Sequence, residues 1–324
     1  MESQETLILA VEIGGTKLQL GLCTPDGQVH KTQRGESPAD QGAQGILAWL
    51  SEHIPAFLRH DAVAGGVVRA IGVGFGGPVD VEQGTALVSH QVEGWNGFPL
   101  RDWFESRYGI PCTVANDSNA AGWGEYILGM GQGTQHFFYS NIGSGIGGAL
   151  VLHGKLYNGQ GRGGGDVGHI YVPDWTTDAP GAADKLEHIC SGWSIERRIR
   201  QWHDLPEESP LFLQCGGKPD TLTCAMLGRA AQDGDTRAKD EIERVAQTLG
   251  IGLATIVTLV HPERIAIGGG VAQMGEVLFE PVRSVVDAHV FGPYRGRYEI
   301  GSCVLGETVV LAGAALLAGE QLHE

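Results

Sequence analysis

The chain has 324 residues, of which 42% are hydrophobic and 19% charged, so it fits two folded domains of ordinary size and not a disordered segment. Its formal net charge of −16 argues against a nucleic-acid partner, because binding a phosphate backbone needs a concentrated positive surface. The six cysteines are scattered and contain no CxxC pair, which predicts a reduced, cytoplasmic protein. No apolar run approaches ~18 residues, so we expect no membrane partner.

Strand and helix patterns alternate along the first part of the chain. Apolar runs between glycine turns are typical of strands, and apolar residues three or four apart are typical of one helix face. In chain order these patterns predict strands at 7–11, 18–23 and 29–35, a helix at 45–59, a strand at 70–75, a helix at 99–108 and a strand at 111–115. A helix running to Met130 follows, with Asp117 and Ser118 as its capping residues.

The order of strand, glycine turn and strand then recurs at about 137–152. The remaining patterns predict helices at 184–202, 222–233 and 236–260, a strand at 264–267 and a last helix from 307 to 320. Alternation of strands with helices indicates the α/β class. The recurrence indicates two related halves, which we expect to form two lobes around a shared cleft.

Two glycine turns have the composition of phosphate-binding sites. They contain Gly14, Gly15, Thr16 and Lys17 in the first half and Gly143, Ser144 and Gly145 in the second. Glycines let backbone N–H groups approach phosphate oxygens, and Thr and Ser hydroxyls add donors. Either turn alone could be an ordinary hairpin turn, and the second is not a Walker A sequence. Two such hairpins in one chain favour phosphate binding.

Two further positions follow predicted strands where a ligand can approach. Asp117 begins a helix, whose N-terminus favours an ionised carboxylate that can accept the proton of a substrate hydroxyl. For an isolated Asp in this place, a plain helix cap is the commoner role. Gly268, Gly269 and Gly270 leave room for a flat group such as adenine, and close packing of the next helix is an equal alternative.

In this order the motifs resemble those of the ROK family of repressors, open reading frames and sugar kinases, within the hexokinase, Hsp70 and actin superfamily. The matching segments are 12–17 and 143–148 for phosphate, 74–80 for sugar, 116–121 for catalysis and 268–270 for adenosine. The resemblance implies a two-lobed, actin-like ATPase (ribonuclease H-like) α/β fold with a central ligand cleft. It implies a smaller domain of residues 1–115 completed by the helix 307–324, a larger domain of residues 116–306, and a homodimer.

The resemblance also implies a role for each site residue. Asp117 would be the general base, and Glu12 would reach Mg²⁺ through water. The sugar ligands would be Gly77, Asn96, Asn116, Asp166, His169 and Glu187. The ligands of ATP and its phosphates would be Gly14, Gly15, Thr16, Lys17, Gly143, Ser144, Gly145, Gly269 and Gly270.

The chain departs from the family pattern at three points. Glu12 stands where most members have Asp, which can shift the Mg²⁺ site, and Asp166 replaces the usual Glu beside the sugar. Many members follow the equivalent of His169 with a cysteine-rich segment that binds structural Zn²⁺. Residues 170–186 contain no cysteine, and a tetrahedral site needs four ligands, so we predict no structural zinc.

Together these residues predict ATP-dependent phosphorylation of a hexose or N-acetylhexosamine, with the 6-hydroxyl and glucose as first choices. Two alternatives remain. A sugar-responsive transcription regulator would need an N-terminal helix-turn-helix, whereas only about six residues precede the first predicted strand. A catalytically inactive sugar-binding protein is the other alternative, motivated by Glu12 and Asp166.

Overall fold

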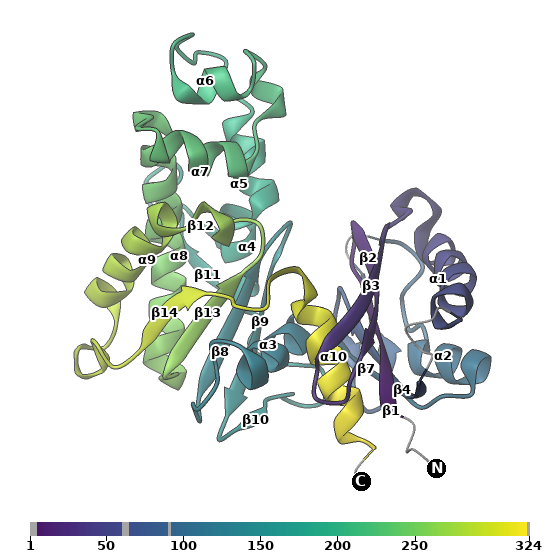
Figure 1. The fold of residues 1–324 in the computed structure, drawn as a ribbon. Coiled ribbons are helices and arrows are strands. Elements are labelled where there is room, and N and C mark those ends of the chain that lie inside the picture. Colours follow the sequence, from purple (N-terminus) through teal and green to yellow (C-terminus); the bar gives the residue numbers. More distant parts are fainter. Residues whose placement is uncertain (1–4, 60–64, 90–91, 323–324) are drawn as a thin grey trace.

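The computed structural model describes residues 5–59, 65–89 and 92–322, whose strands form two five-stranded sheets (Figure 1). The first sheet consists of β1 (Glu5–Ile13), β2 (Lys17–Cys23), β3 (Val29–Glu36), β4 (Gly66–Phe75) and β7 (Cys112–Asn116). The second consists of β8 (Phe137–Ile142), β9 (Ile146–Leu152), β10 (Lys155–Leu156), β13 (Arg264–Gly268) and β14 (Glu299–Ser302). Two short hairpins lie outside them, β5 (Val79–Asp80) with β6 (Thr85–Ala86) and β11 (Tyr171–Pro173) with β12 (Ala183–Lys185).

Both sheets have the same strand topology. Their spatial orders are β3-β2-β1-β4-β7 and β10-β9-β8-β13-β14. In each order the first three strands are antiparallel neighbours, and the last two strands join in parallel. This repetition confirms the α/β class and the two related halves that the glycine turns predict.

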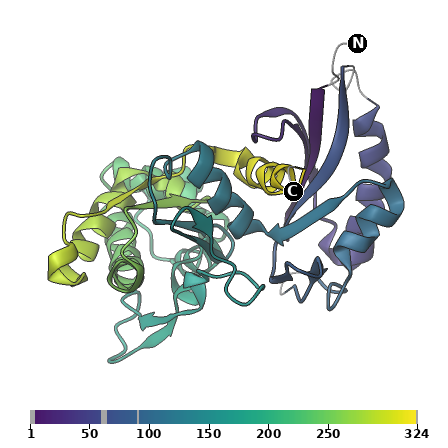
Figure 2. The ribbon, with the colours of Figure 1, turned by 90° about the horizontal axis from the view of Figure 1, so that it is seen from below.

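Helices cover both faces of the first sheet, because its central strands carry apolar side chains on both sides. These helices are α1 (Gly42–Leu58), α2 (Leu100–Tyr108) and, from the end of the chain, α10 (Val309–Glu320). Leu9 of β1 shares a core with α1 and α2, whereas its neighbours Ile8 and Ala10 share a core with α10. Figure 2 shows α1 and α2 on one face of this sheet and α10, in yellow, on the other.

The second sheet is also covered on both faces. One face packs against α3 (Asp117–Leu128) through Tyr139 and Val151. The opposite face, with Phe138 and Ile265, belongs to a large core with α4 (Leu186–Cys190), α5 (Gly192–Ile199), α6 (Pro210–Gln214), α7 (Cys224–Gln232), α8 (Thr236–Val260) and α9 (Glu276–His289). Among the described residues one helix, α8, is long and apolar enough to cross a membrane, and 56% of its apolar window is buried inside the protein.

α3 and α10 connect the two lobes and cross each other in close contact (Figure 1). α3 follows β7 of the first sheet but packs against the second, and α10 follows β14 of the second sheet but packs against the first. A Cβ at Gly313 would lie 1.7 Å from the Ala120 carbonyl oxygen, so the contact requires glycine. The buried carboxylate of Glu125 in α3 accepts the N–H groups of Val304 and Leu305, at 2.8 and 2.7 Å, and so ties α3 to the segment before α10.

The structure corrects several predicted elements. The helix predicted at 184–202 is two helices, α4 and α5, because the backbone of Ser191 is extended and its hydroxyl caps α5. Asn116, and not Asp117, is the N-cap of α3. α9 and β14 lie in stretches for which the sequence patterns predict no element. The division into domains at 115/116, completed by the last helix, stays a prediction, and its ends at residues 1 and 324 lie outside the described residues.

We expect Gly313→Ala to destabilise the protein, because the added methyl group would force α3 and α10 apart. Overpacking costs about 1–3 kcal/mol, and more where backbone has to move, so the urea midpoint should fall clearly. Gly292→Ala is the matched control, since a Cβ there meets no atom within 4 Å. An unchanged midpoint for Gly313→Ala, measured by circular dichroism, would contradict the close crossing.

Candidate active site

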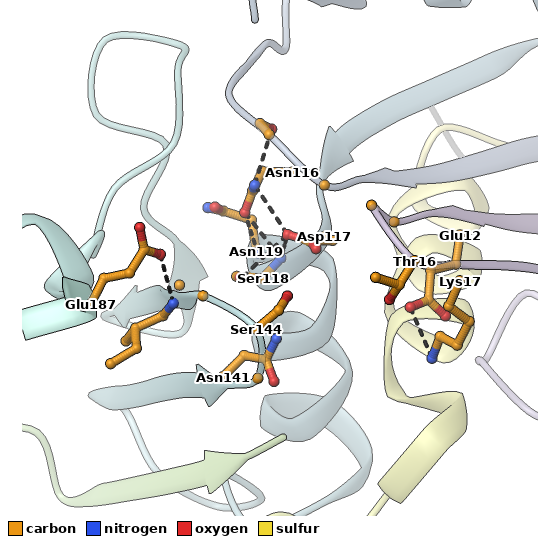
Figure 3. Close-up of a pocket in the computed structure, with 18 of the residues that line it drawn as sticks. Glu12, Thr16, Lys17, Asn116, Asp117, Ser118, Asn119, Asn141, Ser144 and Glu187 are labelled. Atoms are coloured by element: carbon orange, nitrogen blue, oxygen red, sulfur yellow. Dashed lines mark hydrogen bonds and ion pairs between the residues drawn. The ribbon is translucent and has the colours of Figure 1, made fainter. Parts of the chain in front are cut away.

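A cavity of about 490 Å³ lies between the two lobes and is lined by both (Figure 3). Of the residues predicted from the sequence, it brings together Glu12, Gly14, Gly15, Thr16, Lys17, Gly77, Asn116, Asp117, Gly143, Ser144, Gly145, Asp166, His169, Glu187 and Gly270. Segments far apart in the chain meet here for a topological reason. The parallel strands β1, β4 and β7 end at one edge of the first sheet, and β8 and β13 end at one edge of the second.

Two predicted site residues do not line this cavity. Gly269 lines an adjoining cavity of about 220 Å³, which shares Glu12 and Lys17 with the first. Asn96 is exposed in the turn before α2, whereas its neighbour Trp95 is buried. Direct contact of Asn96 with a sugar therefore stays a prediction.

The first glycine turn joins β1 to β2 and lines the cavity. One hydrogen bond closes it, from the Gly14 N–H to the Lys17 carbonyl at 2.9 Å. The N–H groups of Gly15 and Thr16 have no hydrogen-bond partner within the described part of the chain. Two backbone donors are therefore available to an anion where the sequence predicts phosphate.

Glu12 lies beside this turn, at the end of β1, and only 7% of its surface is exposed. One of its carboxylate oxygens pairs with the Lys17 ammonium at 3.0 Å. Burial raises the pKa of Glu12 to about 7, although Lys17 opposes the shift. Because this carboxylate changes charge near neutral pH, a Mg²⁺ ion with its water shell would compete for it with a proton and with Lys17.

The second glycine turn, between β8 and β9, is shorter than its sequence motif. The motif spans 143–148, but only residues 143–145 form the turn, because Gly147 and Gly148 already pair with β8 as part of β9. A hydrogen bond of 2.9 Å from the Gly143 N–H to the Gly145 carbonyl closes the turn. Like the first turn, it lines the cavity.

The segment 187–192 holds this second turn at both ends. The Oε2 atom of Glu187 accepts the N–H of Ile146 at 2.8 Å, directly after the turn (Figure 3). The N–H of Gly192 donates to the Gly143 carbonyl at 2.8 Å, where the turn begins. A residue predicted as a sugar ligand, Glu187, is thus bonded to the predicted phosphate turn.

Asp117 is the first residue of α3 and lies in the cavity wall between the two turns (Figure 3). The Asn116 side chain caps the helix by accepting the N–H groups of Ser118 and Asn119. The Oδ1 atom of Asp117 accepts from the Ser118 N–H at 2.7 Å and from Asn116 Nδ2 at 3.2 Å, whereas no described residue donates to Oδ2. Desolvation raises the pKa of Asp117 to about 6, although these hydrogen bonds oppose the shift. A carboxylate with a pKa near neutrality is suited to proton transfer.

Polar side chains gather at the second-lobe side of the cavity, where Asp166, His169 and Glu187 line it. Burial raises the pKa of Asp166, His169 opposes this shift, and the charge of Glu187 adds to it. Across the cavity, Asn116 Nδ2 donates to the Gly77 carbonyl at 3.0 Å and so ties the start of α3 to the connection between β4 and β5. This set of acceptors and donors can bind several hydroxyl groups at once.

The sequence reasoning missed several residues that line the cavity. They include Arg34, Ser118, Asn119, Asn141, Arg162 and Glu307. Asn119 is only 3% exposed, and its Nδ2 has no hydrogen-bond partner in the described structure. A buried donor of this kind costs about 1–3 kcal/mol until an acceptor reaches it, which fits a cavity that binds a polar ligand. Its position in the 116–121 motif is the signal that could have identified it.

Metal binding by protein side chains alone is not built into the described residues. They contain no group of three or more His, Cys, Asp or Glu side chains that could hold a metal ion. The donors fit Mg²⁺ carried by nucleotide phosphates, because this ion keeps several waters and takes only one or two carboxylates from a protein. The expected lack of structural zinc stays a prediction.

Two related α/β lobes with facing glycine turns define the class of this protein, the two-lobed actin-like ATPase fold. The sequence model of the ROK family matches residues 8–321, so the chain belongs to the ROK family. The chain is 30% identical over 316 residues to a glucokinase of Thermotoga maritima, covering 97% of this chain and 98% of that one.

Two further relatives show what the family contains. The crystal structure of a ROK family glucokinase from Streptomyces griseus, in complex with glucose and AMPPNP, is similar with a TM-score of 0.81 and 31% identity, over 97% of this chain and 99% of that one. A xylose repressor of Caldicellulosiruptor bescii is 24% identical over 97% of this chain and 79% of its own length. The fold predicted from the motifs is confirmed, because solved structures of a ROK glucokinase and a ROK hexokinase match nearly the whole chain.

We expect Asp117→Asn to stabilise the ligand-free protein near neutral pH. The pKa of about 6 in the folded protein lies above the ordinary value of 3.8, so the wild type loses stability as the pH rises between these values. Asparagine has no charge to desolvate, and the gain at pH 7.5 should be on the order of 1–2 kcal/mol. At pH 4 the gain should nearly vanish. Chemical denaturation at both pH values measures the difference.

Glu280→Gln is the control for this comparison, because Glu280 is an exposed carboxylate of α9. It should leave the free energy of unfolding unchanged at both pH values. An Asp117→Asn protein that is less stable than wild type at pH 7.5 would contradict the desolvation of Asp117.

Proposed function

We propose that this chain transfers the γ-phosphoryl group of ATP to a hydroxyl of a hexose or N-acetylhexosamine, with the 6-hydroxyl and glucose as first candidates. The observation that carries the proposal is the position of Asp117, in one cavity with two phosphate-type turns and with a pKa raised to about 6. The related glucokinases support the choice of substrates, since one of them was crystallised with glucose and an ATP analogue.

In this proposal the two glycine turns bind the phosphates of ATP. Backbone N–H groups of Gly15 and Thr16 face one side of the phosphate chain, and the 143–145 turn faces the other. Adenosine lies at the end of β13, beside Gly269 and Gly270. Gly270 leaves open space there, whereas Gly269 is required by its positive φ and by the Ile142 carbonyl oxygen, which would lie 2.4 Å from an added Cβ. The sugar hydroxyls are held by Gly77, Asn116, Asp166, His169 and Glu187, with Asn96 joining them when the lobes close.

Asp117 is the general base. Its Oδ2 accepts the proton of the sugar hydroxyl while Asn116 and Ser118 hold Oδ1 in place. The hydroxyl oxygen forms a bond to the γ-phosphorus, the bond from that phosphorus to the β–γ bridging oxygen breaks, and ADP leaves with the electron pair. Closure of the lobes excludes water and so protects ATP from hydrolysis.

Mg²⁺, when bound with ATP, neutralises phosphate charge. Glu12 is the carboxylate beside the first turn that would meet the water shell of the ion, and Lys17 already neutralises part of its charge. Glu12 is one methylene longer than the Asp that most members have, and its carboxylate pairs with Lys17 at 3.0 Å. The protein's own part here is to place one buried carboxylate and one ammonium beside the phosphates.

We expect Asp117→Ala to lower kcat for sugar-dependent ADP release by about 10²–10⁴-fold, the usual contribution of a general base. In the wild type, kcat/KM should fall as the pH drops below about 6, because Asp117 is then protonated. A cooperative thermal transition would show that the variant is folded. Turnover at the wild-type level would show that another group is the base.

The sugar is identified by measuring phosphorylation of glucose, mannose, fructose, N-acetylglucosamine and N-acetylmannosamine. Binding of a sugar by calorimetry without phosphorylation of any of them would favour a catalytically inactive sugar-binding protein instead. The relation to a xylose repressor keeps a regulatory role as the second candidate. The net charge of −16 weighs against it, because operator DNA attracts positive surfaces.

We also propose that the protein is a homodimer without structural zinc. We expect metal analysis of protein purified without added metal to find far less than one zinc per chain, because no cysteine follows His169 before Cys190. One zinc per chain would contradict this. Solution mass measurement tests the dimer.

A further inference from the structure

The carboxylate of Glu187 belongs to two parts of the cavity at once. Its Oε2 accepts the N–H of Ile146 at 2.8 Å and so holds the end of the phosphate turn (Figure 3). The same side chain lines the cavity with Asp166 and His169, and its charge acts on the pKa of Asp166. Oε1 has no hydrogen-bond partner among the described residues.

The turn is packed directly against this carboxylate. A Cβ at Gly145 would lie 2.5 Å from Glu187 Oε2 and 3.4 Å from the carboxylate carbon of Glu187, and apart from the adjoining residues no other described residue comes within 4 Å. Gly145 is not among the residues with a positive φ angle. A methyl group at 145 would therefore meet the flexible end of the Glu187 side chain, and we expect it to displace that carboxylate.

We propose that Glu187 is a positioning residue that couples sugar binding to nucleotide binding. Oε2 holds the phosphate turn, and Oε1 accepts a hydrogen bond from a sugar hydroxyl. The role of Oε1 rests on the proposed function. A sugar bound to Oε1 fixes the Glu187 rotamer and, through Oε2, the position of Ile146 and the turn. ATP then binds a turn that is already ordered, so each ligand tightens the other by the same factor.

The negative charge of Glu187 weakens nucleotide binding, whereas its positioning of the turn strengthens it. Because the two effects have opposite signs, an affinity measurement can separate them. If Glu187 acted on the phosphates only through its negative charge, removing it would tighten nucleotide binding. If it acts by holding the turn, removing it loosens nucleotide binding, because the ordering of the turn is lost. The sign of the change distinguishes the two.

The first experiment measures AMPPNP affinity by calorimetry, with Mg²⁺ and without sugar. We expect Glu187→Ala to weaken AMPPNP about fivefold, as expected for one lost hydrogen bond that orders the site. His188→Gln is the matched control, since His188 is the next residue of α4, is exposed and pairs with Asp184 outside the cavity. Equal or tighter AMPPNP binding by Glu187→Ala would overturn the proposal, whichever sugar the protein uses.

The second experiment measures glucose affinity without nucleotide. We expect Gly145→Ala, a change in the phosphate turn, to weaken glucose about fivefold because its methyl group displaces the Glu187 carboxylate. In the Glu187→Ala background the same change should have no further effect, since the clashing group is gone. Equal effects of Gly145→Ala in both backgrounds would contradict the proposal.

The two experiments separate this proposal from the proposed function. A wild type that binds AMPPNP but no sugar of the panel would refute the sugar assignment, while the nucleotide experiment still decides whether Glu187 positions the turn. In the wild type, saturating AMPPNP should tighten glucose about fivefold and Glu187→Ala should abolish this coupling. Mutual exclusion of the two ligands would show that the sugar takes Oε2 from Ile146, and would overturn the proposal. Melting temperatures confirm that each variant is folded.

Discussion

The close crossing of α3 and α10 is the constraint on which the rest of the structure depends. Each helix follows a strand of one sheet and packs against the other sheet. Each lobe therefore supplies a helix to the core of the other lobe. At Gly313 the backbones of α3 and α10 touch. The buried Glu125 carboxylate of α3 also accepts hydrogen bonds from the segment that precedes α10. Asp117 begins α3 and Glu307 lies two residues before α10, so both are within seven residues of the crossing at Ala120 and Gly313. In the proposed closure of the lobes, residues near this crossing would move less than more distant segments such as the turn of Asn96.

Desolvation of buried carboxylates in the cavity lowers the stability of the ligand-free protein. The cavity raises the pKa of both Asp117 and Glu12 toward neutrality, because few polar groups reach their carboxylates to replace water. Asn119 adds a buried donor without a partner. These three groups weaken the ligand-free protein, and each is relieved by a ligand that brings hydroxyl donors, cations or acceptors. Binding sites commonly lower the stability of the empty protein in this way, because their polar groups find partners only when the ligand is bound.

Most of the fold and the two turns could be predicted from the sequence, because they depend on local patterns. Alternating apolar residues and glycine pairs identify β1, β2, β8 and β9, and the order of motifs identifies the fold. α9 was missed although Leu278 and Phe279 begin an apolar face, because Pro281 within it is typical of a helix end. The bond between Glu187 and Ile146 could not be predicted, because it joins residues 41 positions apart whose contact depends on how α4 docks on β9. The 116–121 motif could have identified Asn119, but its burial without a hydrogen-bond partner is a property of the folded environment.

The electrostatics of the cavity indicate why the positioning of Glu187 matters. Five carboxylates line it (Glu12, Asp117, Asp166, Glu187 and Glu307) against three basic side chains (Lys17, Arg34 and Arg162), and a nucleotide adds further negative charge. Coulomb repulsion therefore opposes nucleotide binding unless Mg²⁺, these basic side chains and backbone donors offset it. Backbone donors are effective only when they are held in the right place, and Glu187 and Gly192 bond to the two ends of the 143–145 turn. The Glu187 carboxylate orders this turn by its hydrogen bond but repels the phosphates by its charge. It strengthens nucleotide binding only if the ordering outweighs the repulsion. In the proposed mechanism a sugar hydroxyl that donates to Glu187 Oε1 would shift that balance, because it would disperse the charge of the carboxylate and restrain its side chain.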